Sequence, residues 1–150
     1  MSVALVRVDD RLLHGQVLLA WGCALAADRY LVFDDALAAS PFERALVQSC
    51  GGDAEVAIVP LSEGARAFAE EEAREGSAVA HRAGGRLEQV NVGGVHHAPG
   101  KERVHDFVYL GPEDRTALAS LREMSVRVVV QDVPASTPFD APPAWSARVA

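Results

Sequence analysis

The chain has little cysteine, little positive charge and no long apolar run, and each shortage excludes a class of protein. Its 150 residues include two cysteines, Cys23 and Cys50, which lie far apart and outside any C-x-x-C arrangement. A disulfide scaffold or a zinc ribbon therefore has little support. Because free cysteine is often buried, we expect both thiols to be buried or partly buried.

The charge balance excludes a second class. Fourteen lysine and arginine residues stand against 21 aspartate and glutamate residues, which gives a formal net charge of -7. Proteins that bind nucleic acid need a clustered basic surface, and attraction to anionic lipid needs the same feature. We therefore expect no nucleic-acid partner and no direct electrostatic binding to a membrane.

The hydropathy pattern excludes a third class. No segment reaches the roughly 18 apolar residues that span a bilayer, and no basic segment followed by an apolar one opens the chain. We therefore expect a cytoplasmic protein. With 49% hydrophobic and 23% charged residues, residues 1–150 are predicted to form one soluble domain with a substantial core.

Strand-like and helix-like segments alternate along the chain. Strands are predicted at 3–8, 29–33, 55–60, 87–92, 106–110 and 126–131, and helices at 15–26, 41–50, 62–76 and 112–124. The first strand is nearly continuous in apolar side chains, which favours a central position covered on both faces. Residues 77–85 give a weak strand signal, and the proline-rich tail from about residue 134 is expected to be irregular and peripheral. The pattern predicts an α/β fold, a three-layer α/β/α sandwich with an open, mostly parallel sheet in a single domain.

The stretch DDRLLHGQV, residues 9–17, lies where the first strand ends and the first helix begins. In open α/β folds, binding and active sites lie beyond the carboxyl ends of the strands. If His14 directly precedes the helix, the helix dipole disfavours its imidazolium form. The backbone N–H groups of Gly15, Gln16 and Val17 then favour a bound dianion. Glycine at position 15 also lets a phosphate approach the backbone closely.

Two charged residues of the same stretch suit phosphoryl transfer. Arg11 can supply a forked cation to the oxygens of a transferring phosphoryl group. Asp9 is placed to orient that arginine or to hold a proton on one imidazole nitrogen of His14. The stretch therefore predicts a histidine that accepts a phosphoryl group and passes it on. A less specific interpretation stays open, in which His14 is a surface residue while Asp9 and Asp10 close the strand and cap the helix.

Other motifs give weaker signals. The chain has no Walker-type G-x-x-x-x-G-K-[ST] loop and no G-x-G-x-x-G after a strand, so the donor is expected to be something other than a nucleotide bound here. The residues require neither a metal nor another cofactor. His96 and His97 are adjacent in a predicted loop without a cluster of carboxylates or cysteines, which favours loop packing or a partner surface over a metal site. Lys101 and Arg103 are interpreted either as positive charge near the phosphate site or as an ordinary solvated loop.

Two stretches resemble a known family. DDRLLHGQV, with the strand VALVR before it and a Trp-containing helix after it, resembles the signature of the mannose/fructose/sorbose family of phosphotransferase system (PTS) IIB components. The stretch VNVGGVHHAPGKER resembles the Asn-x-Gly-Gly loop and its basic continuation in the later half of that family. The two motifs occur in the expected order, and the resemblance runs from about Val3 to Val133.

The resemblance implies an open α/β fold and a cytoplasmic protein that takes a phosphoryl group from a IIA partner. It would pass that group to a sugar carried by the membrane components IIC and IID, through which it would be membrane-associated. The implied activity is that of a protein-N(π)-phosphohistidine–sugar phosphotransferase. His14 matches the phosphorylated histidine, and Arg11 and Asp9 match the charged residues of its loop.

Further motif positions match the family with less defined roles: Arg7, Gln16, Asn91, Gly93 and Gly94. The Asn-x-Gly-Gly stretch is interpreted either as a loop that lets a partner or phosphate come close or as a turn that needs positive φ.

The segment between Leu61 and Asn91 is shorter than the family pattern, which would alter the partner surface. A phosphorylation-dependent regulatory or sensor module without sugar transport is therefore kept as the alternative function. A metal-dependent hydrolase built on His14, His96 and His97 is the least favoured. The sequence leaves open which sugar is taken, which nitrogen of His14 is phosphorylated, and whether the chain forms a homo-oligomer.

Overall fold

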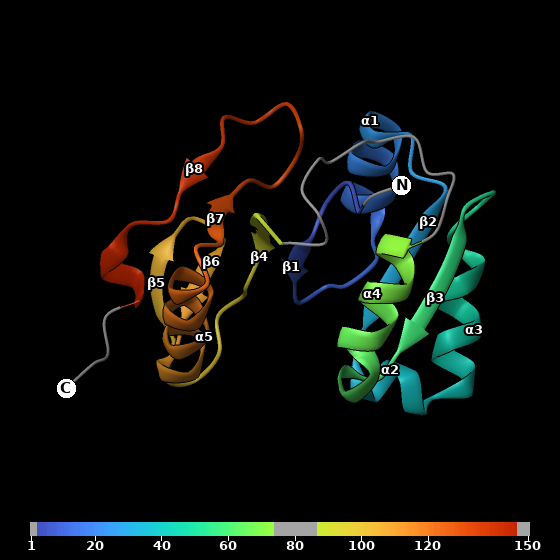
Figure 1. The fold of residues 1–150 in the computed structure, drawn as a ribbon, viewed down its shortest axis with the longest axis horizontal. Helices are drawn as coiled ribbons and strands as arrows, with labels where there is room; N and C mark the ends of the chain where they lie inside the picture. Colours follow the sequence, from blue (N-terminus) through green and yellow to red (C-terminus); the bar gives the residue numbers. More distant parts are fainter. Residues whose placement is uncertain (1–2, 74–86, 147–150) are drawn as a thin grey trace. The chain divides into compact units, whose positions relative to one another are not determined.

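The computed structural model describes residues 3–73 and 87–146, and the side chains of residues 71–73 are not described (Figure 1). The chain forms two compact units. The first comprises Met1–Ala4 and Leu13–Gly85, and the second comprises Leu5–Leu12 and Arg86–Ala150. Each unit has its own strands and helices.

The first unit is built on two parallel strands. β2 (Arg29–Phe33) pairs with β3 (Glu55–Val59) in a register that joins Arg29 to Glu55 and Phe33 to Val59. Helices flank this pair of strands (Figure 1). In chain order they are η1 (Gln16–Gly22, a π-helix), α1 (Cys23–Leu25), α2 (Asp35–Ala39), α3 (Pro41–Ser49), η2 (Leu61–Glu63) and α4 (Gly64–Ala73).

Local side-chain caps explain where the helices after β2 begin. The Asp34 carboxylate accepts a hydrogen bond from the Leu37 N–H at 2.7 Å, which caps α2. The Ser40 hydroxyl accepts from the Glu43 N–H at 3.4 Å, and Pro41 occupies the first turn of α3. The helix predicted at 41–50 corresponds to α3, but no helix is predicted between the strand at 29–33 and residue 41, so the sequence misses α2.

The second unit holds a four-stranded sheet in the order β1-β4-β7-β8. β1 (Arg7–Asp9), β4 (Gln89–Gly94) and β7 (Arg127–Val130) run parallel, and β8 (Phe139–Asp140) is antiparallel to β7. The remaining elements are the antiparallel hairpin β5 (Glu102–His105) with β6 (Val108–Leu110), the helix α5 (Pro112–Glu123) and the short helix η3 (Pro143–Ser146).

The core of the second unit joins the sheet, the hairpin, α5 and the C-terminal segment. Its buried members are Val92, Val108, Leu110, Leu118, Val128, Val130, Ala141 and Trp145. The buried Arg115 of α5 donates to the Trp145 carbonyl at 3.3 Å and to the Glu102 carboxylate at 3.0 Å. Apolar burial and this guanidinium thus attach the segment after β7 to the rest of the unit.

The α/β class with mostly parallel strand pairing is confirmed. The β2 prediction matches its bounds, and the strands predicted at 55–60 and 126–131 lie within one or two residues of β3 and β7. The predicted helix at 112–124 corresponds to α5. The predicted helix at 62–76 corresponds to α4 as far as the described residues reach, and the weak strand signal at 77–85 lies outside them.

Two predictions about the sheet are wrong. The first strand is short, and it stands at the end of the strand order with Val8 48% exposed, whereas an apolar run predicts burial on both faces. The strand that is buried almost throughout is β4, from Val90 to Gly94. β4 extends through Gly93 and Gly94, beyond residue 92 where the predicted strand ends, because parallel pairing with β1 and β7 satisfies its backbone.

The tail and the cysteines also differ from expectation. The chain from about residue 134 is predicted to be peripheral, but β8 pairs with β7, and Trp145 and Ala141 are buried. An aromatic side chain removes enough apolar area from water to hold a proline-rich segment against the core. Cys23 and Cys50 are both exposed rather than buried. The sequence also misses β5, because Val104 is the one apolar residue among Glu102–His105 and the segment has no strand-like apolar pattern.

Replacing Trp145 with alanine is expected to destabilise the protein by about 3–5 kcal/mol, because it removes a buried aromatic side chain from the core. Urea unfolding followed by circular dichroism measures the change. The matched control is Met124→Ala, at a side chain that is 54% exposed, which should stay within about 0.5 kcal/mol of the parent. Equal stabilities of the two variants would show that the tail is peripheral after all.

Candidate active site

A buried carboxylate lies between two arginines at the carboxyl end of β1. The Asp9 side chain is 3% exposed, and its Oδ2 accepts from Arg7 Nη2 at 2.9 Å. Arg11 binds the same carboxylate with Nε to Oδ1 and Nη2 to Oδ2, each at 3.0 Å, and its backbone N–H donates to Oδ1 at 3.1 Å. Asp9 therefore fixes the plane of the Arg11 guanidinium through two parallel hydrogen bonds.

Arg7 connects this carboxylate to the neighbouring strands. Its Nη1 donates to Asn91 Oδ1 at 2.6 Å and to the Gln131 carbonyl at 2.9 Å, and Nη2 also contacts the Asp132 carbonyl at 3.2 Å. Asn91 lies within β4, while residues 131 and 132 directly follow β7. One planar guanidinium thus connects the three parallel strands.

The two glycines of β4 make room for this cluster. A Cβ atom at Gly93 would lie 1.8 Å from the Arg7 guanidinium carbon. A Cβ at Gly94 would lie 3.3 Å from Arg11 Nη2 and 3.4 Å from Asp9 Oδ1. Neither glycine has positive φ, so the turn interpretation of the Asn-x-Gly-Gly stretch is wrong. Here glycine serves close approach of side chains to a strand backbone.

The charges of the cluster stabilise one another. Burial by itself would raise the pKa of Asp9, but hydrogen bonds from Arg11 and the charges of Arg11 and Arg7 outweigh it and hold that pKa below its ordinary value. The hydrogen bond to Asp9 raises the pKa of Arg11. A hydrogen bond from Ser136 lowers the pKa of Asp132, next to the Arg7 contact.

His14 lies in the first unit, at the head of its first helix. The Leu18 N–H donates to the His14 carbonyl at 3.0 Å, so His14 opens the helical hydrogen bonding, and Gly15 already has helical backbone angles. The N–H groups of Gly15, Gln16 and Val17 belong to the first turn, for which a helix supplies no carbonyl acceptors. The His14 ring places Nε2 3.4 Å from Gln16 Oε1. The predicted position of the histidine before the helix is therefore confirmed.

The helix that follows His14 is unusual, because η1 is a π-helix over seven residues. Segments of π-helix are rare and often lie at functional sites. A Cβ at Gly22 would lie 1.9 Å from the Tyr30 hydroxyl oxygen, so this glycine lets the tyrosine of β2 pack against the helix backbone. Burial raises the pKa of Tyr30.

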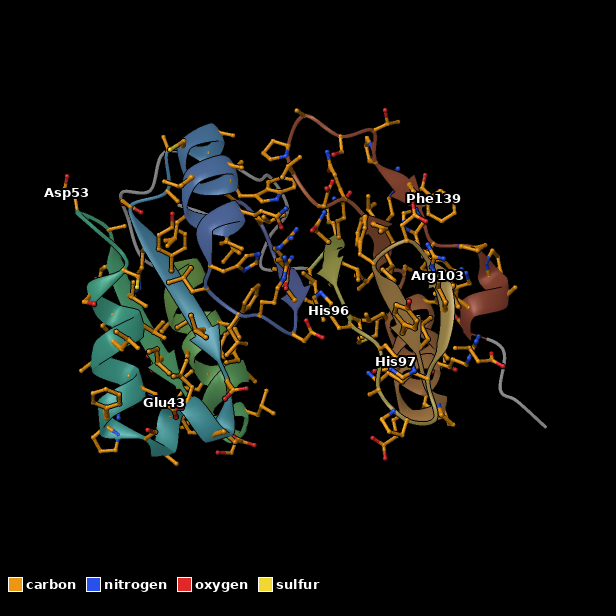
Figure 2. The ribbon with its side chains drawn as sticks, turned by 180° about the vertical axis from the view of Figure 1, so that it is seen from behind. Glu43, Asp53, His96, His97, Arg103 and Phe139 are labelled. Carbon is orange, nitrogen blue, oxygen red and sulfur yellow. The ribbon has the colours of Figure 1, made fainter. Side chains whose placement is uncertain are left out.

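A second histidine is held by a carboxylate, and the sequence misses this pair. Asp10 Oδ1 lies 2.6 Å from His96 Nδ1, and Asp10 Oδ2 accepts from the His96 backbone N–H at 2.6 Å. Figure 2 shows His97 beside the β5–β6 hairpin, where its ring meets Tyr109 edge-on with centroids 5.5 Å apart. Asp10 and His96 are 86 positions apart in the chain, and no local signal predicts their contact.

The basic residues of the next loop are bound to other partners. Lys101 Nζ lies 3.0 Å from Asp114, and Arg103 Nη2 lies 2.7 Å from Asp106. Within residues 3–73 and 87–146, no group of three or more histidine, cysteine, aspartate or glutamate side chains could hold a metal ion. Among the same residues, no helix has both the length and the apolar character needed to cross a bilayer.

A family comparison identifies the chain. Residues 3–145 match the model of the family described as PTS system sorbose subfamily IIB component. The chain belongs to this family of IIB components. The match includes both of the stretches on which the resemblance rests. Proteins of this family are components of sugar phosphotransfer systems.

Curated relatives agree with this membership. The chain is 30% identical to the N-acetylgalactosamine-specific phosphotransferase enzyme IIB component 1 of Escherichia coli K12, over 89% of this chain and 92% of that protein. It is 26% identical to the PTS system fructose-specific EIIB component of Bacillus subtilis, over 93% of each. It is also 26% identical to the mannose-specific EIIAB component of Escherichia coli K12, of which it matches 45%.

Solved structures share the fold. The IIBSor domain of the sorbose permease from Klebsiella pneumoniae superposes with a TM-score of 0.76 at 23% identity, over 93% of each chain. The N-acetylgalactosamine-specific IIB component 1 of Escherichia coli gives a TM-score of 0.75 at 23% identity, over 93% of this chain and 99% of that one. These similarities support the fold of this IIB chain.

The structure groups the predicted site residues of the IIB chain within its units. In the second unit it brings together Asp9, Arg11, Arg7, Asn91, Gly93 and Gly94. In the first unit it places His14, Gly15, Gln16 and Val17 at one helix start. The sequence did not predict that the carbonyls of Gln131 and Asp132 accept hydrogen bonds from Arg7, nor that Asp10 pairs with His96.

The variant Gly93→Ala of the IIB chain is expected to lose about 1–3 kcal/mol of stability, because its Cβ overlaps the Arg7 guanidinium. The control Gly15→Ala has nothing within 4 Å of the added Cβ and sits in a helical conformation, so it should gain up to about 1 kcal/mol. Chemical unfolding compares the two. Equal effects would contradict the packing role of Gly93.

The stability of the IIB chain should fall in acid in part because of Asp9. Its folded pKa lies below the unfolded value of about 3.9, so its contribution is complete above that value and is lost as pH falls through the folded pKa. Asp9→Asn should cost about 3 kcal/mol near pH 7, because it leaves the buried Arg7 without its carboxylate partner. Urea unfolding at a series of pH values should show this difference shrinking in acid.

The control for this experiment is Asp140→Asn, which removes the partner of Arg127 from an exposed ion pair and should leave stability nearly unchanged at every pH. A constant difference between Asp9→Asn and the parent from pH 7 down to about pH 3, below the unfolded pKa, would contradict the assignment.

Proposed function

We propose that this chain is the phosphoryl carrier of a sugar phosphotransferase system. His14 accepts a phosphoryl group from a phosphorylated IIA partner and transfers it to a sugar taken up through the membrane components IIC and IID. The observation that carries the proposal is the family match over residues 3–145, which includes a histidine at the head of a helix.

The surroundings of His14 support a role as acceptor. A helix start attracts anions, because its N–H groups point outward along the helix dipole. A Cβ at Gly15 would meet nothing within 4 Å, so there is space beside the backbone at this position. These features favour a histidine that carries a dianionic group over one that serves only as a cap.

The contact of His14 with Gln16 supports a choice between the two ring nitrogens as the phosphorylated atom. In a neutral imidazole one nitrogen carries hydrogen and the other carries a lone pair. If His14 Nε2 donates to Gln16 Oε1, the lone pair lies on Nδ1. We therefore assign Nδ1, the N(π) atom, as the phosphorylated nitrogen.

Arg11 is the proposed ligand of the transferring phosphoryl group, three residues before His14 in the chain. Its side chain is 38% exposed, and Asp9 holds its guanidinium in one plane through Nε and Nη2. A guanidinium that is oriented before the reaction stabilises the charge of the transition state without reorganising at that moment. Arg7 acts one step further away, as a positioning residue for Asp9.

Each transfer exchanges one bond to phosphorus for another. His14 Nδ1 attacks the phosphorus of phosphohistidine on IIA, a new N–P bond forms, and the donor N–P bond breaks with its electron pair returning to the donor imidazole. A sugar hydroxyl oxygen then attacks the phosphorus on His14. An O–P bond forms, the N–P bond breaks, and the hydroxyl proton is released, so that the His14 imidazole is restored.

The names of the relatives guide the choice of partners. One relative carries EIIA and EIIB in a single name and is described as mannose-specific, and others are described as specific for N-acetylgalactosamine, fructose or sorbose. We therefore propose a IIA component as donor and a sugar of this general kind as acceptor. The regulatory alternative rests on the shortened segment before Asn91, much of which lies outside the described residues, so no structural observation favours it.

The test is transfer of labelled phosphoryl from a phosphorylated IIA partner. The parent chain should gain one acid-labile phosphoryl group on His14 Nδ1, His14→Ala should gain none, and His97→Ala should behave like the parent. Arg11→Lys should slow the transfer by about 100-fold, because lysine cannot keep the two-point bond to Asp9. Quenched-flow labelling with mass mapping measures the rates and the site.

If IIA labelled His14→Ala to the same extent as the parent, the assignment of His14 as the phosphoryl acceptor would be wrong. Labelling of His14 without any sugar phosphorylation, in vesicles that contain IIC and IID, would instead favour the regulatory module.

A further inference from the structure

We propose that Nε2 of His96 is a second phosphoryl acceptor of this chain, with the Asp10 carboxylate as its orienting group. The donor class is a small-molecule phosphoramidate, in which phosphorus is bonded to nitrogen. The proposal goes beyond the proposed function and does not depend on it.

One carboxylate holds His96 at two points. Asp10 Oδ1 lies 2.6 Å from the ring nitrogen Nδ1, and Asp10 Oδ2 accepts from the backbone N–H of His96 at 2.6 Å. Because one contact binds the main chain and the other binds the ring, the carboxylate sets the position of the residue and the rotation of its side chain together.

Both residues leave ordered strands. Asp10 follows β1, and its N–H donates to the Gly94 carbonyl at 3.0 Å. His96 follows Val95, which donates to the Phe107 carbonyl at 3.0 Å and accepts from the Tyr109 N–H at 2.9 Å. The backbone at Asp10 and the backbone next to His96 are therefore both held by hydrogen bonds, as a preorganised site requires.

The chemistry follows from the partner of Nδ1. A carboxylate can only accept hydrogen bonds, so Nδ1 carries the ring hydrogen and the neutral ring has its lone pair on Nε2. The His96 side chain is 54% exposed and that of Asp10 is 42% exposed, so a donor can reach the ring. An aspartate bonded to Nδ1–H stabilises the positive charge that the ring acquires when Nε2 forms a new bond.

The proposed step is a direct displacement. Nε2 attacks the phosphorus of phosphoramidate, a new N–P bond forms, and the original P–N bond breaks with its electron pair leaving on nitrogen. The leaving nitrogen takes a proton from water and departs as ammonia. Phosphorylated His96 keeps its Nδ1–H bond to Asp10.

The adjacent histidine offers a matched comparison. His97 is exposed as His96 is and lies in the same loop, but its ring packs edge-on against Tyr109 (Figure 2). If exposure alone governed phosphorylation, both histidines would react. If the carboxylate governs it, His96 reacts and His97 does not.

The experiment uses the full chain with His14→Ala, so that the proposed primary acceptor is absent, and adds phosphoramidate without any IIA protein. Mass mapping under alkaline conditions locates the label, and NMR distinguishes the Nε2 from the Nδ1 isomer. The comparison set adds His96→Ala, His97→Ala or Asp10→Asn to the same background. A parallel set built on His14→Gln covers poor folding of the alanine variant.

We expect one phosphoryl group on His96 Nε2, which His96→Ala abolishes and His97→Ala leaves unchanged. Asp10→Asn should slow labelling about tenfold, which corresponds to about 1.4 kcal/mol of activation free energy. No label, equal label on both histidines, label on Nδ1, or an unchanged rate in Asp10→Asn would each overturn the proposal. None of these results bears on transfer from IIA to His14, because His14 and IIA are both absent.

Discussion

The charge cluster at the carboxyl end of β1 depends on a single constraint, which is that a buried carboxylate must be paired. Asp9 is almost fully buried and meets this requirement with Arg7 on one side and Arg11 on the other. Arg7 is itself buried, and its Nη1 and Nη2 groups also donate to Asn91 and to the carbonyls that follow β7. The close approach of three parallel strands to one guanidinium then requires glycine at position 93.

This constraint links packing to chemistry. The surface arginine of the cluster, Arg11, is oriented by a carboxylate that the core holds in place, so its position does not rely on a flexible loop. A IIB component needs such rigidity, because the protein's main contributions to phosphoryl transfer are to position the reacting groups and to stabilise their charge. The same end of the sheet also holds Asp10 against His96, through backbone that β1 and β4 fix.

Much of the fold was predictable, because most of its elements carry local signals. The helix predicted at 41–50 corresponds to α3, and the strand predicted at 29–33 matches β2. The failures occur where distant partners decide the outcome. Gly93 resembles a turn residue until Arg7 is seen against it, and the proline-rich tail resembles a loop until Trp145 is seen in the core.

The sequence by itself determined the α/β class, the family and the identity of the histidine and arginine that the motif carries. It could do so because strand and helix periodicity and the order of residues 9–17 are properties of neighbouring positions. Only the tertiary structure decided that Asp9 is clamped by two arginines, that Asn91 serves Arg7, and that Asp10 orients His96. These pairings join residues up to 86 positions apart, and burial and sheet register, rather than local propensity, bring them together.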